Sequence, residues 1–482
     1  MGKQYDIAFL GGGPAGYQGA IRAAQLGAKV TVVEDRLLGG VCLNRGCIPT
    51  KAVRASAEVG RSMRRAREYG FTPVEVVPDI AAIISRKQRI VAALRKSIEG
   101  LFRAHRIDLI EGRGRLNGHG KIEVRKSGEK TPVEAEKIVI TTGSRPAGLD
   151  VFPDAPRILP ADEMLDIPYL PAHLLVVGGG AVGVEMAAIF CELGSRVTLV
   201  EALDRILPHE DAEMATNLAS ILHRRKVKVH CGVRIDSVAE SGQGFTVLLS
   251  DGTELVPDTI LQAVGRRLNT EELGLEKLGI VVDRGAIVVD KHLQTSRPGY
   301  YAAGDVTGGW MLAHVAFAEG ICAAENALGM ESVPDYRVVP RCVFSIPEYA
   351  SVGLSEEEAR NLYPVRVGRF PFKSLGMAQA LGELEGLVKI IAHAETDQVL
   401  GAHILGAHAA DLVQEIAPAM KSNLSVREIM GTIYTHPTLS EAVLEAVQEL
   451  HGRAIHALPK NLAEGVSDNA GTYRSKSLRE RL

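Results

Sequence analysis

The sequence predicts an α/β protein with two Rossmann-like dinucleotide-binding domains and a separate C-terminal α+β domain. A glycine-rich turn that follows an apolar strand occurs near the N-terminus and again in the middle of the chain. From about residue 336 the strands and helices continue without such glycines. With 482 residues, 46% of them hydrophobic, the chain is long enough for about three domains.

The first dinucleotide-binding unit begins with the apolar run 5–10 and continues through a helix-like stretch at 17–26 to a second strand, 29–33, which ends at Glu34. The turn after the first strand contains Gly11, Gly13 and Gly16. Such glycines allow a tight turn, the approach of a pyrophosphate to a helix N-terminus and close packing of helix on strand, while the acid binds a ribose hydroxyl. The strand, the helix and the acid at the expected distance distinguish this unit from a plain glycine turn.

The second unit repeats the first. Its turn contains Gly178, Gly180 and Gly183. Its second strand ends at Glu201, and in both units the acid follows the first glycine by 23 positions. Two units predict two dinucleotides, and we expect a prosthetic flavin in the first, which a cysteine pair follows directly, and an exchangeable nicotinamide in the second. Glu201 favours NAD over NADP, because a carboxylate accepts the 2′-hydroxyl and repels a 2′-phosphate, whereas Arg205 stands alone.

Cys42 and Cys47 are candidates for a redox-active disulfide. In an unbroken helix, residues five apart have Cα atoms about 8–9 Å apart, beyond the limit of about 7 Å for a disulfide. A bridge therefore needs a distorted backbone at a helix start, which Asn44, Gly46 and Pro49 favour and where a thiolate is stabilised. The alternatives are two core cysteines or half of a metal site. No further Cys or His stands nearby at matched spacing, so no metal site is predicted.

Composition and charge argue against several classes of protein. The net charge of −3 provides no electrostatic reason to expect nucleic acid or an anionic membrane as a partner. No stretch approaches the roughly 20 apolar residues of a membrane span, and a strand that begins at Tyr5 leaves no room for a signal peptide. Six cysteines are too few for a secreted disulfide scaffold. We therefore expect a cytoplasmic protein, in which a disulfide is usually catalytic.

Two buried strands end in turns that bear on the domain organisation and on cofactor binding. A buried strand at 137–141 closes into a turn that contains Thr142 and Gly143, and we place the first domain boundary just after it, near residue 148. The strand at 300–303 ends in Gly304 and Asp305. That carboxylate either reaches a ribityl or phosphate group or belongs to a simple strand-ending turn.

The C-terminal region has one stretch that suggests chemistry, at 436–441. A helix N-cap at Thr438 or Ser440 would place the Glu441 carboxylate beside the His436 imidazole. A histidine held by a carboxylate is arranged for proton transfer, whereas a His-Pro turn can also be purely structural.

Several of these stretches resemble the disulfide-reductase flavoproteins, which are class I pyridine nucleotide-disulfide oxidoreductases. The resemblance is carried by the sequence 40–51 around the cysteines, by 303–307 with 312–314, and by 436–441. The Cys-Leu-Asn-x-Gly-Cys-Ile-Pro form at 42–49 and the sequences 202–208 and 347–354 are most similar to the dihydrolipoamide dehydrogenases. The resemblance covers nearly the whole chain.

The resemblance implies a homodimer in which the partner's interface domain completes each active site. It implies an FAD-binding domain at 1–148, an NAD-binding domain at 149–271, a central segment at 272–336 that returns to the FAD domain, an interface domain at 337–462 and a polar tail at 463–482.

The resemblance also assigns roles to individual residues. Cys42 would be the thiol that exchanges with the substrate, and Cys47, nearer the flavin, would be the charge-transfer thiolate. His436, oriented by Glu441, would move the proton that thiol exchange requires. The remaining implied site residues are the flavin-side ion pair Lys51 and Glu185; Gly11, Gly13, Gly16, Glu34, Lys51, Thr142, Gly143, Asp305 and Ala313 for FAD; and Gly178, Gly180, Gly183, Glu201 and Gly265 for NAD.

The implied activity is the oxidation of protein-bound dihydrolipoamide to lipoamide with NAD+ as final acceptor. The implied partner is the lipoyl domain of a 2-oxo acid dehydrogenase complex or of the glycine cleavage system. Arg45, Thr50 and Tyr434 differ from the commonest family residues, and Arg45 beside the cysteines leaves another small disulfide or a metal ion open as the substrate. No cysteine follows Cys342, so the C-terminal thiol pairs of mercuric reductases and large thioredoxin reductases are absent. The alternative that is not an enzyme is a flavoprotein whose main role is to bind to a multienzyme assembly.

Overall fold

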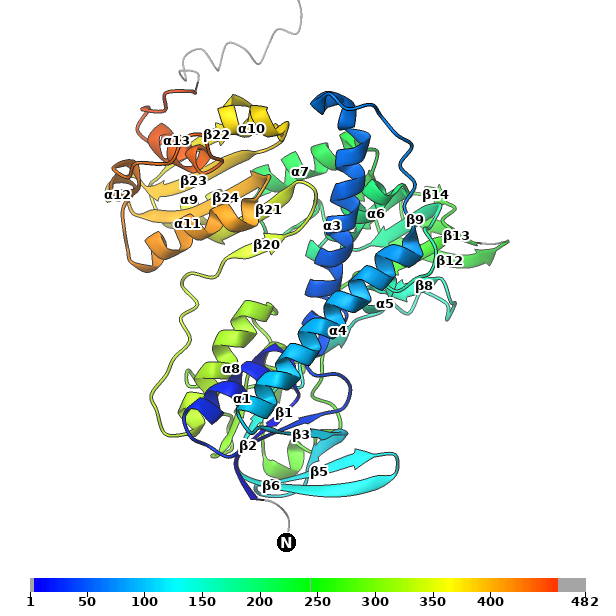
Figure 1. The fold of residues 1–482 in the computed structure, drawn as a ribbon, viewed down its shortest axis with the longest axis vertical. Helices are drawn as coiled ribbons and strands as arrows, with labels where there is room; N and C mark the ends of the chain where they lie inside the picture. The colour runs from blue at the N-terminus through cyan, green and yellow to red at the C-terminus, as the bar shows by residue number, and fades with distance from the viewer. Residues whose placement is uncertain (1–3, 243, 458–482) are drawn as a thin grey trace, which may run out of the picture. The chain divides into compact units, whose positions relative to one another are not determined.

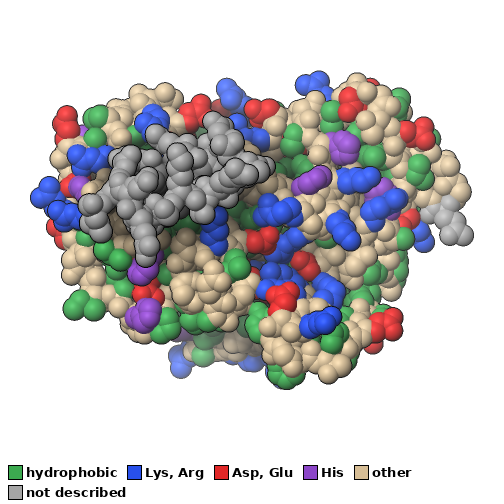
Figure 2. Space-filling view, turned by 90° about the horizontal axis from the view of Figure 1, so that it is seen from above, with side chains coloured by type: hydrophobic (Ala, Val, Ile, Leu, Met, Phe, Trp, Pro, Cys, Tyr) green, Lys and Arg blue, Asp and Glu red, His purple; other side chains and the backbone are tan. Residues whose placement is uncertain are grey.

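The computed structural model describes residues 4–242 and 244–457, so the predicted tail at 463–482 lies outside the described residues. The chain forms two compact units (Figure 1). The first contains the described residues up to 209 together with 215–339 and 343–346, and the second contains 210–214, 340–342 and the described residues from 347 onward. Within the described ranges, no helix has the length and apolar character needed to cross a membrane. On the face drawn in Figure 2, acidic and basic side chains are interspersed.

One sheet of the first unit has the strand order β3-β2-β1-β6-β5-β4, with β19 also paired with β6. Its strands are β1 (Gln4–Leu10), β2 (Val30–Glu34), β3 (Asp108–Glu111), β4 (Arg113–Leu116), β5 (Lys121–Lys126), β6 (Glu129–Ile140) and β19 (Tyr300–Ala302). β1, β2, β3, β6 and β19 pair in parallel, whereas β4 and β5 extend the sheet with antiparallel pairs. From Ile7 onward β1 is apolar because both of its faces are covered: Ile7 and Phe9 belong to one core cluster, and Ala8 and Leu10 belong to another.

Two helices beside this sheet pack backbone against backbone. They are α1 (Pro14–Gln25) and α8 (Ala313–Ala327), which lie side by side in Figure 1. A Cβ atom on Gly19 would lie 2.6 Å from the Gly320 carbonyl oxygen, and a Cβ atom on Gly320 would lie 2.1 Å from that of Ala15. Glycine is therefore required at both positions for this close approach. The other helices of this region are α2 (Gly40–Asn44), α3 (Cys47–Arg64), η1 (Ala66–Tyr69), α4 (Ile80–Ala104) and η3 (Asp305–Thr307).

The second parallel sheet of the first unit has the order β11-β10-β9-β15-β8. Its strands are β8 (Ile158–Pro160), β9 (His173–Val177), β10 (Arg196–Glu201), β11 (Lys228–Cys231) and β15 (Thr259–Gln262), with helices α5 (Ala161–Met164), α6 (Ala181–Leu193) and α7 (Ala212–Arg224). The smaller elements are β7 (Ser144–Pro146) paired with β16 (Arg266–Leu268), the sheet of β12 (Ile235–Ser241), β13 (Gly244–Leu249) and β14 (Glu254–Leu255), the pair β17 (Val282–Asp283) and β18 (Ala286–Ile287), and η2 (Glu276–Leu278). The two predicted Rossmann-like units are thus present, each as a set of parallel strands within its own sheet.

The second unit is built on a sheet with the order β20-β21-β24-β23-β22, as expected for an α+β domain. Its elements are β20 (Arg341–Val343), β21 (Glu348–Gly353), β22 (Val365–Pro371), β23 (Leu387–His393), β24 (Val399–Gly406), α9 (Glu356–Leu362), η4 (Phe372–Ser374), α10 (Gly376–Leu381), α11 (Ala409–Lys421), α12 (Val426–Met430) and α13 (Glu441–Glu449). The pairs β21–β24, β24–β23 and β23–β22 are antiparallel. α13 packs closely on β22 at Gly368, where a Cβ atom would lie only 2.0 Å from the Ala446 carbonyl oxygen.

A buried ion cluster within the second unit leads to a stability prediction. Lys389 is 1% exposed, and its ammonium lies 2.9 Å from both Asp211 oxygens, 2.8 Å from Glu213 and 2.7 Å from Glu356. Lys389→Met should lower the free energy of unfolding by about 3–5 kcal/mol, because it leaves the buried carboxylate of Asp211 without its cation. Urea denaturation measures the change. The exposed Lys373→Met is the control, expected within about 0.5 kcal/mol of wild type; a similarly small change for Lys389→Met would contradict the prediction.

Candidate active site

The cysteine pair lies at a break between two helices. Cys42 belongs to α2, and Cys47 is the first residue of α3. The chain leaves helical geometry at Arg45, with φ −144° and ψ 0°, and at Gly46, with φ −124° and ψ −108°. The Gly46 carbonyl then accepts the Thr50 amide at 3.0 Å and the Thr50 hydroxyl at 2.7 Å, which anchors the first turn of α3. The distorted backbone that the five-residue spacing requires is therefore present.

The two sulfur atoms are hydrogen-bonded and differ in acidity. Both cysteines are free thiols in the structure, so the predicted disulfide, the oxidised form of this pair, stays a prediction. The hydrogen bond from the Cys42 thiol lowers the pKa of Cys47 from 9 to about 7, and the Lys51 cation acts in the same direction. The pKa of Cys42 is raised, first because its proton is held in that bond and second because it is buried. Near neutral pH the pair therefore holds its negative charge on Cys47.

Lys51 and Glu185 form an ion pair in the first unit. The Lys51 ammonium lies 3.0 Å from Glu185 Oε2 and 3.2 Å from Oε1. Phe344 supports the pair in two ways that the sequence did not indicate: its backbone N–H donates to Glu185 Oε1 at 2.8 Å, and its ring centre lies 4.1 Å from the Lys51 ammonium. No local sequence signal connects Phe344 with residues so distant in the chain.

The glycine turns of the two dinucleotide units have matching geometry. Gly11 and Gly178 have φ of +114° and +105°, and a Cβ atom on either would lie 2.3 Å from a backbone carbonyl oxygen. A Cβ atom on Gly16 or Gly183 would lie 1.9 Å from the carbonyl oxygen of Gly11 or Gly178. These four glycines are therefore required by the protein's own packing.

Gly13 and Gly180 behave differently from the other four glycines. Their φ values are −71° and −72°, which any residue adopts, and a Cβ atom would meet one atom at 3.9 Å in the first case and none within 4 Å in the second. Each precedes a helix whose N-terminus has no side-chain cap. Open space in front of uncapped N–H groups fits the approach of a dinucleotide pyrophosphate to both turns.

The acids of the two units also hold equivalent positions. Glu34 accepts the Gly12 amide at 2.7 Å and the Arg36 amide at 2.8 Å, and burial raises its pKa. Glu201 accepts the Gly179 amide at 2.6 Å and the Leu203 amide at 2.8 Å. Each carboxylate thus lies at the glycine turn of its own unit, where it can accept from a ribose hydroxyl.

The other predicted cofactor residues lie at strand or helix ends of the first unit. Thr142 and Gly143 follow β6 and are tied to Asn269, Gly143 has φ +69°, and Ala313 begins α8. Asp305 follows β19, and its carboxylate accepts the Ser144 hydroxyl. Gly265, with φ +116°, lies between β15 and β16, and a Cβ atom there would meet no atom within 4 Å.

Arg45 interacts with a buried acid outside its own segment. Its Nε lies 4.0 Å from the carboxylate of Asp162, which is 8% exposed. The Arg266 guanidinium lies 3.8 Å from the same carboxylate and donates to the Ser144 hydroxyl at 2.6 Å. The unusual arginine between the two cysteines therefore belongs to a charged cluster that sequence spacing did not reveal.

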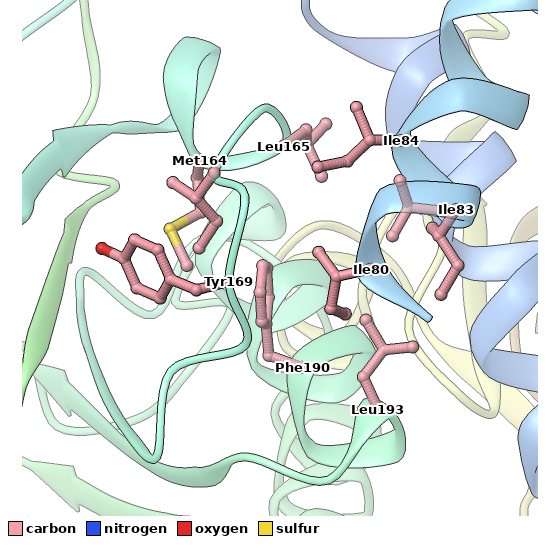
Figure 3. Close-up of a pocket in the computed structure, with 10 residues that line it drawn as sticks. Ile80, Ile83, Ile84, Met164, Leu165, Tyr169, Phe190 and Leu193 are labelled. Atoms are coloured by element: carbon pink, nitrogen blue, oxygen red, sulfur yellow. The ribbon is translucent and has the colours of Figure 1, made fainter. Parts of the chain in front are cut away.

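A small pocket between α3, α4, α5 and α6 has no comparable chemistry. Figure 3 shows its lining, in which isoleucines of α4 face Met164, Leu165, Phe190 and Leu193. Its polar group is the hydroxyl of Tyr169, which lies 3.4 Å from that of Thr259. We interpret this pocket as packing between helices.

The histidine and its carboxylate lie together in the second unit. His436 Nδ1 is 2.8 Å from Glu441 Oε1, and the Thr438 amide donates to Glu441 Oε2 at 2.9 Å. α13 begins at Glu441 with Ser440 in the N-cap position, as expected, but the Ser440 hydroxyl donates to Glu415 at 2.6 Å and makes no cap. The side chain of His436 is 79% exposed. The dyad and the cysteine pair thus belong to different units.

Comparisons with known proteins agree with this architecture. Residues 5–320 match the family model described as pyridine nucleotide-disulphide oxidoreductase, and residues 339–447 match the dimerisation domain of the same family. Dihydrolipoyl dehydrogenase from Bacillus subtilis is 40% identical over 475 residues, covering 95% of this chain and all of the relative. The enzyme of the same name from Thermus scotoductus is 43% identical over 469 residues, covering 95% of this chain and 99% of the relative.

Solved structures show the same fold. LpdA from Mycobacterium tuberculosis has a TM-score of 0.87 and 33% identity, covering 93% of this chain and 99% of that one. The Cu(II) complex of the HOCl-induced flavoprotein disulfide reductase RclA from Escherichia coli has a TM-score of 0.85 and 28% identity, covering 92% and 99%.

Two dinucleotide units, a dithiol and a dimerisation domain together define an FAD-dependent disulfide oxidoreductase that uses a pyridine nucleotide. The chain belongs to the pyridine nucleotide-disulphide oxidoreductase family. The dimerisation domain supports a homodimer.

Proposed function

We propose that the protein is a dihydrolipoyl dehydrogenase, which oxidises protein-bound dihydrolipoamide to lipoamide with NAD+ as final acceptor. The observation that carries the proposal is the hydrogen-bonded pair of Cys42 and Cys47 at a helix start, with the pKa of Cys47 lowered to about 7. The relatives named dihydrolipoyl dehydrogenase, at 40% and 43% identity, support this substrate. The proposed partner is the lipoyl domain of a 2-oxo acid dehydrogenase complex or of the glycine cleavage system.

Thiol exchange at the pair accounts for the first half of the reaction. In the oxidised enzyme, a substrate thiolate attacks Cys42 Sγ, which forms a mixed disulfide, breaks the Cys42–Cys47 bond and leaves Cys47 as a thiolate. The second substrate thiol loses its proton to His436 and attacks the substrate sulfur of the mixed disulfide, which releases lipoamide and Cys42. The enzyme gains two electrons as a dithiol, and the lowered pKa of Cys47 makes it the better leaving group.

The residues of the first unit fit FAD. When bound, FAD supplies the two-electron relay between the dithiol and the nicotinamide. We propose that Gly11, Gly13 and Gly16 hold its pyrophosphate, that Glu34 accepts from its ribose, and that the Lys51–Glu185 pair stands beside its ring. Thr142, Gly143, Asp305 and Ala313 complete the proposed FAD contacts. The proposed domains are accordingly an FAD-binding domain at 1–148, an NAD-binding domain at 149–271, a central segment at 272–336 that returns to the FAD domain, and an interface domain at 337–462.

We further propose that His436 serves the cysteine pair of the partner subunit. Two features of the second unit support this: the His436 side chain is 79% exposed although Glu441 orients it, and the nearby Ile433 is 97% exposed. An exposed isoleucine beside an oriented but exposed histidine is expected where a second subunit covers both.

The second cofactor is proposed to be NAD. Glu201 is held at the second glycine turn, with Gly178, Gly180, Gly183 and Gly265 as the other proposed contacts. Arg205 donates to the Pro208 carbonyl at 3.0 Å and lies 3.6 Å from Asp204, so both terminal nitrogens of its guanidinium contact its own loop. We expect kcat/KM for NAD+ to exceed that for NADP+ about a hundredfold or more, because a carboxylate repels a 2′-phosphate. Glu201→Gln should lower the ratio of kcat/KM for NAD+ to kcat/KM for NADP+. A wild-type kcat/KM for NADP+ equal to or above that for NAD+ would contradict the proposal.

Anaerobic turnover tests the function as a whole. Purified FAD-loaded protein should reduce NAD+ with dihydrolipoamide, and faster still with a dihydrolipoylated lipoyl domain. The alternatives are a reductase of another small disulfide or of a metal ion, and a flavoprotein that chiefly binds an assembly. Turnover of glutathione disulfide or Cu(II) without dihydrolipoamide oxidation would favour the first alternative, and no turnover with any of these would favour the second.

A further inference from the structure

Glu319 is a buried carboxylate of α8 that has no part in the catalysis or the cofactor contacts proposed above. It is 4% exposed. Its Oε2 accepts the backbone N–H of Gly304 at 2.6 Å, and its Oε1 accepts the hydroxyl of Tyr336 at 2.7 Å. All three residues belong to the first unit. Burial raises the pKa of Glu319, whereas both hydrogen bonds oppose that rise, so the two donors stabilise the charged form.

The first donor belongs to the turn that contains a proposed FAD contact. Gly304 has φ +78° and ψ −161°, a conformation that favours glycine, and Asp305 follows it. A Cβ atom on Gly304 would lie 3.3 Å from the Cβ atoms of both Ala15 and Ala316, so the turn is held between α1 and α8. The bond to Glu319 fixes the backbone N–H of Gly304, the residue immediately before Asp305.

The second donor belongs to the tether that leads from α8 to the second unit. The tether, residues 328–339, ends where the second unit takes up the chain at Pro340. Asn326 fastens it by exchanging two 2.8 Å hydrogen bonds with the backbone of Ser332. Glu319 lies seven residues, or about two helical turns, before Asn326 and so faces the same side of α8. The tether therefore runs back along α8, which brings the Tyr336 hydroxyl to Glu319.

We infer that Glu319 is a positioning residue for the Gly304–Asp305 turn, and that Tyr336 holds the Glu319 carboxylate in place. FAD retention then depends on a hydroxyl of the tether into the dimerisation domain. Asn326 fastens the same tether through Ser332. The tether is therefore held by Asn326 as well, whereas the Gly304–Asp305 turn is held by Glu319. The inference rests on the assignment of FAD to the first glycine unit and is independent of the substrate.

The rate of FAD release tests this role. The FAD-loaded dimer is diluted into low urea, and the rise of flavin fluorescence is followed. Tyr336→Phe should accelerate release about tenfold, because a hydrogen bond to a buried carboxylate is lost. Glu319→Ala should accelerate it at least as much. Glu319→Gln should release FAD more slowly than Glu319→Ala, since its amide oxygen still accepts the Gly304 N–H.

Tyr5→Phe is the matched control. Tyr5 also donates to a carboxylate, that of Asp108, at 2.8 Å and within the first unit, but at the edge of the sheet. Its release rate should equal that of wild type. Wild-type release rates in Tyr336→Phe and Glu319→Ala, or an equal acceleration in Tyr5→Phe, would overturn the inference. A wild-type protein that binds no FAD would contradict the proposed function instead.

Discussion

Cys42→Ser and Cys47→Ser should each lower kcat for dihydrolipoamide oxidation by at least about a thousandfold, because both sulfurs form or break a bond in every turnover. The two variants should differ in their absorption spectra. In oxidised Cys42→Ser, Cys47 cannot form a disulfide and remains available as a thiolate, so a long-wavelength thiolate-to-flavin absorption is expected. Cys47→Ser should lack that absorption in every redox state.

The pH dependence of the absorption gives an independent check on the lowered pKa of Cys47. In wild-type enzyme reduced with dithiol, the absorption should appear as pH rises through about 7 and disappear below it, because Cys47 with a pKa of about 7 is a thiolate only above that value. A cysteine with an ordinary pKa of 9 would place the midpoint about two pH units higher. Cys191→Ser is the control, since burial raises the pKa of Cys191 and its thiol donates to the Arg225 carbonyl; its activity and spectrum should match wild type. If Cys47→Ser keeps the absorption and Cys42→Ser lacks it, the absorption belongs to Cys42 and the proposed roles are contradicted.

Mixed dimers of Cys47→Ser and His436→Ala should regain activity that neither variant has alone. His436→Ala alone should lower kcat about 10²–10⁴-fold, as expected for the loss of an acid–base group. If the histidine serves the partner's cysteines, each mixed dimer contains one intact centre, with both cysteines from one chain and His436 from the other. Random pairing makes half of the dimers mixed, so about a quarter of wild-type activity should return after the two variants are refolded together.

A second mixture is the control for this experiment. Cys42→Ser mixed with Cys47→Ser contains no chain with both cysteines, so it should stay inactive whichever subunit supplies the histidine. If mixed dimers of Cys47→Ser and His436→Ala form, as shown by two affinity tags, but remain as inactive as their parents, then the shared site is wrong and the histidine acts within its own chain.

The two dinucleotide units could be predicted because all of their determinants lie within about 30 contiguous residues. A parallel strand, a glycine turn and a helix are each specified locally, and the acid at the end of the next strand returns to the turn through neighbouring strand pairing. The matching hydrogen bonds of Glu34 and Glu201 show how closely the duplicated sequence becomes duplicated geometry. The break between Cys42 and Cys47 was predictable for the same reason, since the spacing and Gly46 are local.

The strand β21 shows where the local pattern was insufficient. No alternation of apolar and polar residues marks 348–353 as a strand, although Tyr349, Ala350 and Val352 are buried there between β20 and β24. Tyr349 also donates to Glu210 at 3.0 Å, a residue 139 positions earlier. A strand buried on both faces lacks the alternation of apolar and polar residues that identifies a half-buried strand.

The sequence by itself determined the α/β class, the two glycine turns with their acids, and the candidate chemistry of the cysteine pair and of His436 with Glu441. The tertiary structure decided which residues support the site from elsewhere in the chain. Phe344 contacts Lys51 and Glu185, Asp162 lies near Arg45, and Tyr336 donates to Glu319. The physical reason is distance along the chain. Turns, helix starts and strand ends depend on neighbouring residues, whereas a hydrogen bond between groups that lie far apart in sequence forms only after sheets and helices have packed, and no local periodicity records it.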